Sequence, residues 1–224
     1  MGRLIYTLEN GELEATRMRA TDFSYLVKKA KELGAVEAKV IPASKVVVED
    51  RVRLKCLTGC DDYGLKFCCP PYAPSVDEFR KMLRDYRYAL FMKFKTSAES
   101  SEDVTMNVMR YMYDPEVPAQ LKEKAQDYYG KWLVDGKRIL LAVLELERLA
   151  FNHGCVFATG FMAGSCMLCT KCDVSQKTCI YPTMMRFPEH AVGINMIKTA
   201  KNAGSSVVFP VRGKPQGAAL LLID

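Results

Sequence analysis

The sequence predicts an α/β or α+β fold, in which a mixed sheet is flanked by helices and interrupted by two cysteine-rich loops. Short runs of β-forming residues alternate, imperfectly, with amphipathic helical stretches. Hydrophobic residues make up 49% of the 224 residues, which is enough to build a core. All but one of the nine cysteines fall in two segments that are rich in glycine and proline. We therefore expect a single domain over 1–224, with cysteine-rich loops at 53–74 and 164–189.

Local signals place the helices and strands in order. Ser75-Val-Asp-Glu78 is a capping box, in which the serine caps a helix and Glu78 reaches back to it. Apolar residues at helical spacing from Lys137 to Phe151 predict a long amphipathic helix, which Gly154 ends. The predicted helices are 21–33, 75–86, 98–135 with breaks near Asp114, Pro115 and Pro118, 137–151 and 188–204, and the predicted strands are 36–41, 45–48, 88–95, 155–160, 206–211 and 218–223.

The amino-terminal segment bears on how the thiols are interpreted. Met1 to Glu9 contains no long apolar core and no small-residue cleavage site, so we expect no signal peptide. The longest apolar run is far short of the roughly 20 residues that cross a bilayer. We therefore expect a soluble, cytoplasmic protein that does not enter membranes. In a reducing cytosol, metal binding or catalysis explains nine cysteines better than a disulfide framework does.

Composition and missing motifs exclude several classes of function. The net charge of +6 is modest, and no dense patch of lysine and arginine is present, so we expect no nucleic-acid partner. The chain has no Gly-rich phosphate loop, no G-x-S-x-G and no H-E-x-x-H motif. Nothing therefore argues for nucleotide, flavin or serine-hydrolase chemistry.

The second cysteine-rich segment carries the strongest signal in the sequence. Cys166, Cys169, Cys172 and Cys179 follow the spacing C-x2-C-x2-C-x6-C, with Pro182 shortly after the last cysteine. Thiolates at steps of three can each reach a different iron of one cubane, as in the bacterial ferredoxin run. Structural zinc is the competing interpretation, although it usually uses two C-x2-C pairs separated by a longer spacer. The spacing favours a [4Fe–4S] cluster held by these four cysteines.

The first cysteine-rich segment predicts another metal centre. Cys56, Cys60, Cys68 and Cys69 lie within a short stretch whose glycines and prolines indicate tight turns. Adjacent cysteines rarely bind the same ion because their side chains diverge. We therefore prefer Cys56, Cys60 and Cys69 as ligands, with Cys68 as the less secure member. Three thiolates would leave one metal position open for substrate or water, whereas four would make a structural zinc or a second electron-transfer cluster.

Several positions together match the pattern of a known family. They are Arg53 to Cys56, Tyr63-Gly64, Cys69 to Pro71 with Pro74, the triple Cys166, Cys169 and Cys172, then Cys179, Pro182, Arg186 to Ile194, and Leu220 to Asp224. On these residues the chain, from about Arg51 to its end, resembles the predicted metal-binding proteins of domain of unknown function 2284. The resemblance implies metal binding at cysteine-rich sites and supplies no reaction. Cys68 and Cys155 depart from the family pattern.

Three further residues each have a functional and a simpler structural interpretation. Arg186 follows the second cysteine-rich segment, so it can stabilise a bound anionic cluster or bind an anionic substrate, or it can simply pair with Glu189. His190 is a candidate for proton transfer or metal binding at the start of its predicted helix. Cys155 stands alone on an apolar segment. A role as a small core residue is a simpler interpretation of it than a role as a missing metal ligand.

Three functions follow from these sites. The first is an iron–sulfur protein with one [4Fe–4S] cluster and a second metal centre, which transfers electrons or serves a partner enzyme as a redox accessory. The second is an enzyme whose incompletely ligated cluster acts as a Lewis acid or sulfur carrier. The third is an interaction module stabilised by zinc. The first function requires a redox partner protein. The sequence is also compatible with a homodimer.

Overall fold

The computed structural model of the chain describes residues 4–9, 12–17 and 19–224. Its central sheet has the strand order β3-β4-β6-β5, and each neighbouring pair is antiparallel. The strands of this sheet are β3 (Ala35–Pro42), β4 (Tyr88–Lys95), β5 (Thr159–Met162) and β6 (Gln216–Ile223). A separate antiparallel hairpin precedes it, formed by β1 (Leu4–Glu9) and β2 (Glu12–Arg17). The predicted combination of helices with a sheet is confirmed.

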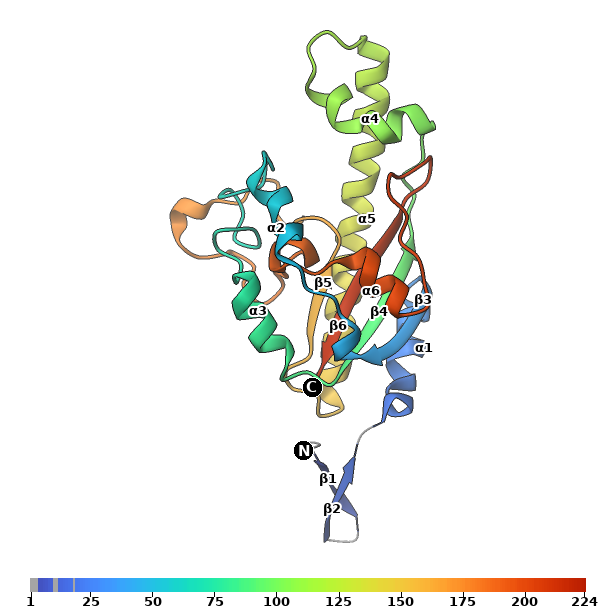
Figure 1. The fold of residues 1–224 in the computed structure, drawn as a ribbon, viewed down its shortest axis with the longest axis vertical. Helices are drawn as coiled ribbons and strands as arrows, with labels where there is room; N and C mark the ends of the chain where they lie inside the picture. The colour runs from blue at the N-terminus through green and yellow to red at the C-terminus, as the bar shows by residue number, and fades with distance from the viewer. Residues whose placement is uncertain (1–3, 10–11, 18) are drawn as a thin grey trace.

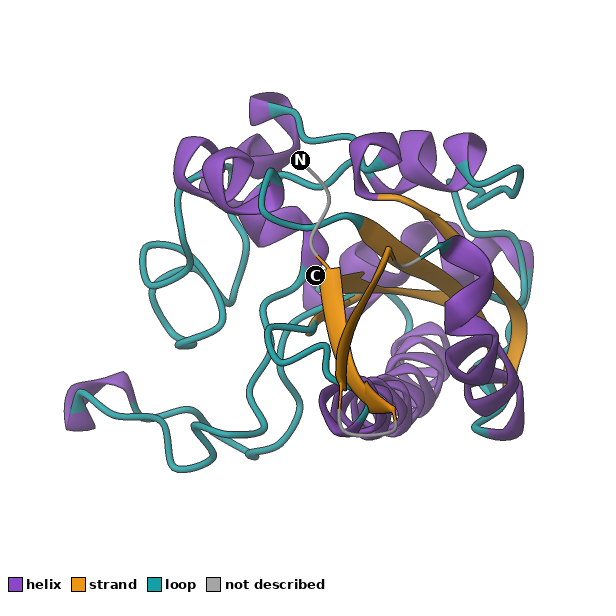
Figure 2. Ribbon diagram, turned by 90° about the horizontal axis from the view of Figure 1, so that it is seen from below, coloured by secondary structure: helices purple, strands orange, loops and turns teal. Residues whose placement is uncertain are grey.

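Helices cover both faces of the central sheet (Figures 1 and 2). One face packs against the first helix and the long helix, and the other packs against shorter helices. The helices are α1 (Ser24–Glu32), α2 (Asp50–Leu57), α3 (Val76–Leu83), α4 (Glu102–Tyr113), α5 (Ala119–Asn152) and α6 (Met196–Asn202), with the short 3-10 helices η1 (Ala20–Phe23), η2 (Ala43–Lys45), η3 (Val174–Gln176) and η4 (Glu189–Val192).

Strand β6 lies at the centre of the core because both of its faces are apolar. Side chains alternate between the two faces of a strand. Leu221 therefore joins the cluster formed with α1 and α5, and Leu220 joins the cluster formed with α3 and α6. Both residues are fully buried. A continuous apolar run is what a strand covered on both sides requires, and it explains why this strand could be predicted from its sequence.

Three of the predicted strands differ from the structure. Residues 45–48 form no strand, and Val48 makes only an isolated bridge with Ile194. Residues 206–211 are a loop that contains Pro210, which has no N–H to give to a ladder. The strand predicted over 155–160 begins only at Thr159, because Cys155 still donates its N–H to Ala150 O and continues the end of α5.

Two helix predictions also change, each at a glycine. Gly136 lies inside α5, which continues through the predicted break and joins 119–135 to 137–152 in one helix. The helix predicted over 188–204 is instead divided into η4 and α6 at Gly193. Gly193 has φ +86°, and a Cβ there would lie 2.8 Å from Val76 Cγ1. The left-handed backbone and the close approach of α3 both require glycine at this position.

Gly160 on β5 also packs closely against α5, and its substitution tests the packing between these two elements. A Cβ at Gly160 would lie 2.0 Å from Val143 Cγ1, on a β-branched side chain that cannot easily rotate away. We expect Gly160→Ala to lower the free energy of unfolding by about 1–3 kcal/mol through overpacking. Urea unfolding followed by circular dichroism measures it. Gly130→Ala is the matched control, because nothing lies within 4 Å of a Cβ there and the helix gains up to about 1 kcal/mol. Equal stability of the Gly160→Ala variant and the wild type would contradict the packing described here.

Candidate metal centre

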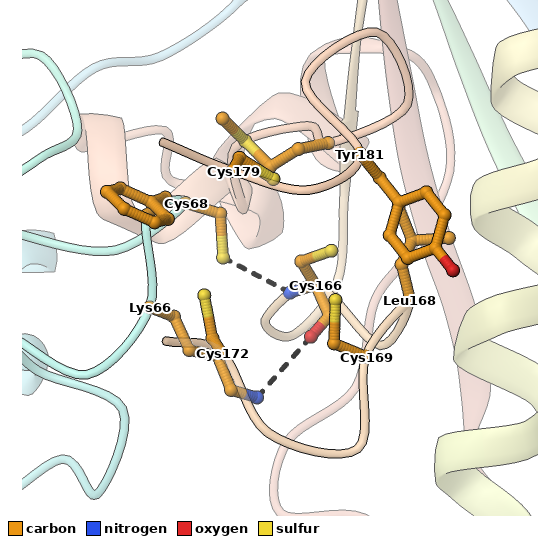
Figure 3. A pocket seen from close by; sticks show the side chains of 10 residues that line it. Lys66, Cys68, Cys166, Leu168, Cys169, Cys172, Cys179 and Tyr181 are labelled. Atoms are coloured by element: carbon orange, nitrogen blue, oxygen red, sulfur yellow. Dashed lines mark hydrogen bonds between the residues drawn. The ribbon is translucent and has the colours of Figure 1, made fainter. Parts of the chain in front are cut away.

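The two cysteine-rich segments lie beside the sheet (Figure 1) and both line one cavity, which Figure 3 shows from close by. Half of the residues that line this cavity are cysteines from the two loops. Figure 3 shows Lys66 and Cys68 of the first segment facing Cys166, Cys169 and Cys172 of the second. The lining residues are Lys66, Phe67, Cys68, Cys166, Leu168, Cys169, Cys172, Cys179, Tyr181 and Met185. We call this space the cysteine pocket.

The second cysteine-rich segment is fixed to the sheet and to α5 where it begins. Immediately after β5, the N–H of Ala163 donates to the carbonyl of Ala218, and Gly164 then turns the chain with φ +82°. Met167 packs directly on Gly136 of α5, where a Cβ would lie 2.4 Å from Met167 Sδ. The glycine inside the long helix thus makes room for the loop that carries Cys166 and Cys169.

Cys68 joins the first segment to the second at the pocket. Its side chain is 1% exposed, and its Sγ accepts a hydrogen bond from the N–H of Cys166 at 3.2 Å. Next to it, Lys66 Nζ lies 3.0 Å from a carboxylate oxygen of Asp62 and donates to Ser165 Oγ at 2.8 Å. The two loops are therefore linked by direct contacts in the structure.

Burial, and to a lesser extent crowding, opposes the ionisation of two thiols of the pocket, Cys166 and Cys169. Burial, together with the neighbouring thiols of Cys68, Cys169 and Cys179, raises the pKa of Cys166 to about 11. Burial also raises the pKa of Cys169. Several thiolates so close together are stable only when a positive charge compensates them, and a metal ion or cluster supplies such a charge. Binding of a metal in this pocket would therefore be coupled to the release of protons from the thiols.

The remaining cysteines of the first segment form a second group beside the pocket. Cys56 is buried, and burial followed by the charge of Cys60 raises its pKa. Cys69 Sγ lies 3.7 Å from Cys68 Sγ. Their hydrogen bond lowers the pKa of Cys68 against the effect of burial and raises that of Cys69. Cys56 belongs to α2, so the predicted loop over 53–74 begins only after Leu57.

The structure thus brings the predicted cysteines into two groups that touch at Cys68 and Cys69. None of the nine cysteines, all of which lie within 19–224, forms a disulfide. Within the described ranges, no three histidine, cysteine or acidic side chains stand together in a way that could hold one metal ion. The assignment of Cys56, Cys60, Cys68, Cys69, Cys166, Cys169, Cys172 and Cys179 as metal ligands therefore remains a prediction.

Arg186 is not among the residues that line the cysteine pocket. Its guanidinium forms a two-pronged ion pair with Glu147 of α5, in which Nε donates to Oε1 at 2.6 Å and Nη2 pairs with Oε2. The expected partner Glu189 is not involved. Among the residues that line the pocket, the cationic side chain is Lys66. Sequence reasoning missed Lys66 because its only distinction is its three-dimensional place between the two loops, and the cofactor role of Arg186 stays a prediction.

Cys155 lies apart from both cysteine groups. It is 2% exposed and belongs to the apolar cluster that α1 and α5 form with the sheet. Cys155 also approaches Tyr25, whose pKa is raised by burial and by this thiol. Its position in this cluster is that of a small core residue.

Glu189 and His190 lie on η4, which packs against α2. Burial lowers the pKa of His190. Glu189 is buried, and in the described part of the chain its Oε2 has no hydrogen-bond partner. Burial raises the pKa of Glu189 from 4.5 to about 8. A carboxyl group with a raised pKa binds its proton more tightly in the folded chain than in the unfolded one.

Glu189→Gln should therefore change how stability depends on pH. The contribution of Glu189 to stability is greatest below its unfolded pKa of about 4.5, falls as the pH rises, and is fully lost above about 8. The glutamine variant lacks this loss, so we expect its advantage over the wild type to grow between pH 6 and pH 9 by on the order of a few kcal/mol. Urea unfolding midpoints at both pH values, at equal metal content, measure it. Parallel pH profiles of the two proteins would show that Glu189 ionises freely.

Comparison with known proteins adds a family match. A family model described as "Predicted metal-binding protein (DUF2284)" matches residues 39–223, a range that includes all nine cysteines. No curated protein and no solved structure matches the chain. Among the described residues, the helices are too short or too polar to span a bilayer.

Proposed function

The chain belongs to the DUF2284 family of predicted metal-binding proteins, and from this premise we propose that it is an iron–sulfur protein that transfers electrons to or from a partner protein. A [4Fe–4S] cluster is held in the cysteine pocket, and a second metal centre is held by Cys56, Cys60 and Cys69. The protein works in the cytoplasm, where thiols stay reduced.

The observation that carries this proposal is the convergence of five thiols on one cavity. Cys166, Cys169 and Cys172 supply three ligands, and Cys68 and Cys179 line the same space. Soft thiolate ligands select iron–sulfur clusters, zinc or copper(I), and a continuous triple at steps of three is typical of iron–sulfur clusters. The donor set therefore fits a [4Fe–4S] cluster.

Side chains around the thiols suit an electron-transfer site. When bound, a [4Fe–4S] cluster takes up and gives back single electrons at a potential set by hydrogen bonds, charge and solvent exposure. The N–H of Cys166 is directed at a sulfur, and Lys66 brings a positive charge to an anionic site. Phe67, Leu168, Tyr181 and Met185 form the rest of the wall and limit the access of water.

A second candidate function is an enzyme that uses an open position on the second centre. The observation in its favour is that Cys68 lines the cysteine pocket, which leaves three thiols in the first segment for the second centre. A metal with three protein thiolates keeps a position for a substrate or a sulfur species, which it can polarise as a Lewis acid. His190, on η4 beside α2, is a candidate proton donor for that position.

Elemental analysis of protein purified without oxygen tests the proposal. We expect iron and acid-labile sulfide in equal amounts, a brown colour, and a broad absorption near about 400 nm that reduction bleaches. A colourless protein with stoichiometric zinc would overturn it and leave a zinc-stabilised interaction module, which chelation would unfold without a redox signal. Electron paramagnetic resonance of the reduced protein then separates one cluster from two. A non-protein ligand on one iron would favour the enzyme.

A further inference from the structure

The cysteine pocket contains one thiol more than a [4Fe–4S] cluster needs, because such a cluster takes four cysteine ligands. We propose that Cys68, from the first cysteine-rich segment, is the fourth ligand of the cluster held by Cys166, Cys169 and Cys172, and that Cys179 is dispensable for binding it. This inference rests on the proposed function and specifies its ligand set. It moves a ligand from one predicted centre to the other.

Cys68 is already positioned to bind an iron of the cluster. It is 1% exposed, whereas the four cysteines of the second segment are half-buried. Its sulfur points into the pocket toward the start of the second loop, where the N–H of Cys166 donates to it at 3.2 Å (Figure 3). Hydrogen bonds from the backbone to ligand sulfurs are one of the means by which proteins stabilise iron–sulfur clusters.

Cys68 is also held in place by the loop around it. The N–H of Cys69 donates to Lys66 O at 3.0 Å, and the N–H of Gly64 donates to Pro70 O at 2.8 Å, which closes the turn. Lys66 then reaches across to Ser165, next to Cys166. A ligand whose position is fixed before the metal arrives loses less conformational entropy on binding than a mobile one does.

Cys179 lines the same pocket from a more exposed stretch of the chain. Its approach runs through η3 and Lys177, whose φ of 60° is the left-handed conformation that non-glycine residues seldom adopt. The next residue, Ile180, is 71% exposed. Binding of an iron by Cys179 therefore restricts side chains on an exposed stretch, a cost that the already buried Cys68 carries to a smaller extent.

The same assignment simplifies the second centre. Adjacent cysteines are expected to diverge, but the sulfurs of Cys68 and Cys69 lie 3.7 Å apart, and the assignment gives one of them to each centre. Removal of Cys68 from the first segment leaves Cys56, Cys60 and Cys69. The two centres then lie next to each other in the structure, joined by the peptide bond between residues 68 and 69.

Alanine variants of the two competing cysteines test the inference. Cys68→Ala, Cys179→Ala and the control Cys155→Ala, which alters a core thiol away from the pocket, are purified without oxygen. Iron and sulfide per chain and electron paramagnetic resonance of the oxidised protein are measured. We expect Cys68→Ala to lose one iron of the cluster, giving a three-iron signal, or to lose the whole cluster. Cys179→Ala and Cys155→Ala should keep the wild-type iron content and spectrum.

Cys68→Ser guards against a trivial folding defect in the alanine variant. Serine keeps the volume and offers an oxygen ligand, so this variant should keep the four irons of the cluster and show shifted resonance lines once the protein is reduced. The inference fails if Cys68→Ala keeps the wild-type cluster, or if Cys179→Ala loses an iron, alone or together with Cys68→Ala. A wild-type protein that contains no iron would instead overturn the proposed function itself.

Discussion

Replacement of Cys169 by alanine is expected to abolish the iron–sulfur cluster of the cysteine pocket. Cys169 is the middle member of the triple and lines the pocket beside Cys166 and Cys172. Without its thiolate, one iron has no protein ligand, and the neighbouring Cys166 thiol holds its proton tightly because burial raises its pKa to about 11. Even outer-shell changes at metal sites cost about 10- to 100-fold in affinity. Loss of a ligand should therefore lower the iron occupancy of this centre at least tenfold.

Iron and sulfide per chain, with the bleachable visible absorption, measure this loss. Iron that survives in Cys169→Ala belongs to the second centre, and a further Cys56→Ala substitution should remove it. Cys155→Ala is the matched control, since Cys155 is a buried cysteine of the core that lies outside both groups. Retention of the full wild-type iron content by Cys169→Ala would contradict the assignment of the triple as cluster ligands.

The elements predicted correctly are those that local signals decide. Strand β4 has the predicted bounds, Tyr88–Lys95, because its apolar residues form one buried run between turns. Helix α3 begins after Ser75, whose side chain accepts from the N–H of Glu78 as the capping box predicts. Periodicity and capping act within a few residues of the chain, so they can be seen without knowledge of the fold.

The elements predicted wrongly depend on partners from elsewhere in the fold. Residues 206–211 contain β-formers, yet in the described chain they join no sheet, and Pro210 has no N–H to give to a ladder. A strand exists only where another strand pairs with it, and β propensity measures packing rather than an intrinsic preference. Gly136 shows the converse, because tertiary packing on Met167 keeps a helix intact through a residue that locally favours a break.

The same difference between local and long-range signals applies to the candidate site. The spacing of Cys166, Cys169 and Cys172 is a local pattern, and the structure places all three on one pocket. The approach of Cys68 spans 98 residues of sequence, so nothing in the first segment could reveal that it lies at the second. Lys66 and the pair of Arg186 with Glu147 are equally non-local, which is why one cation was missed and the other was assigned to the wrong carboxylate.

The second large effect is expected from Glu147→Ala, which removes the carboxylate that connects three parts of the fold. Glu147 lies on α5 with its side chain 10% exposed, and it accepts hydrogen bonds from Arg186 and from the N–H of Gly160 on β5. Arg186 in turn donates to the carbonyls of Met185 and Thr183, just after the second cysteine-rich segment. The alanine variant leaves Nε and Nη2 of the guanidinium, and the N–H of Gly160, without their carboxylate acceptor.

Breaking a buried ion pair on one side costs about 3–5 kcal/mol, because the other charge is left buried and uncompensated. We expect a loss of this size in the free energy of unfolding of Glu147→Ala, measured by urea unfolding without oxygen at equal metal content. Since the pair fixes the chain that leaves the cysteine pocket, the variant should also lose iron faster to a chelator. Wild-type stability of the variant would show that water replaces the carboxylate at no cost.

Helix α5 offers a matched control two residues away. Glu145 makes the same two-pronged pair with Arg148, at 2.9 Å to Nε and 2.6 Å to Nη2, but the arginine side chain is 62% exposed. Glu145→Ala should cost less than about 1 kcal/mol, because water screens an exposed pair. The double variant Glu147→Leu with Arg186→Met separates charge from packing. It should recover most of the stability lost in Glu147→Ala, and the remaining deficit of about 1–3 kcal/mol belongs to the unsatisfied N–H of Gly160.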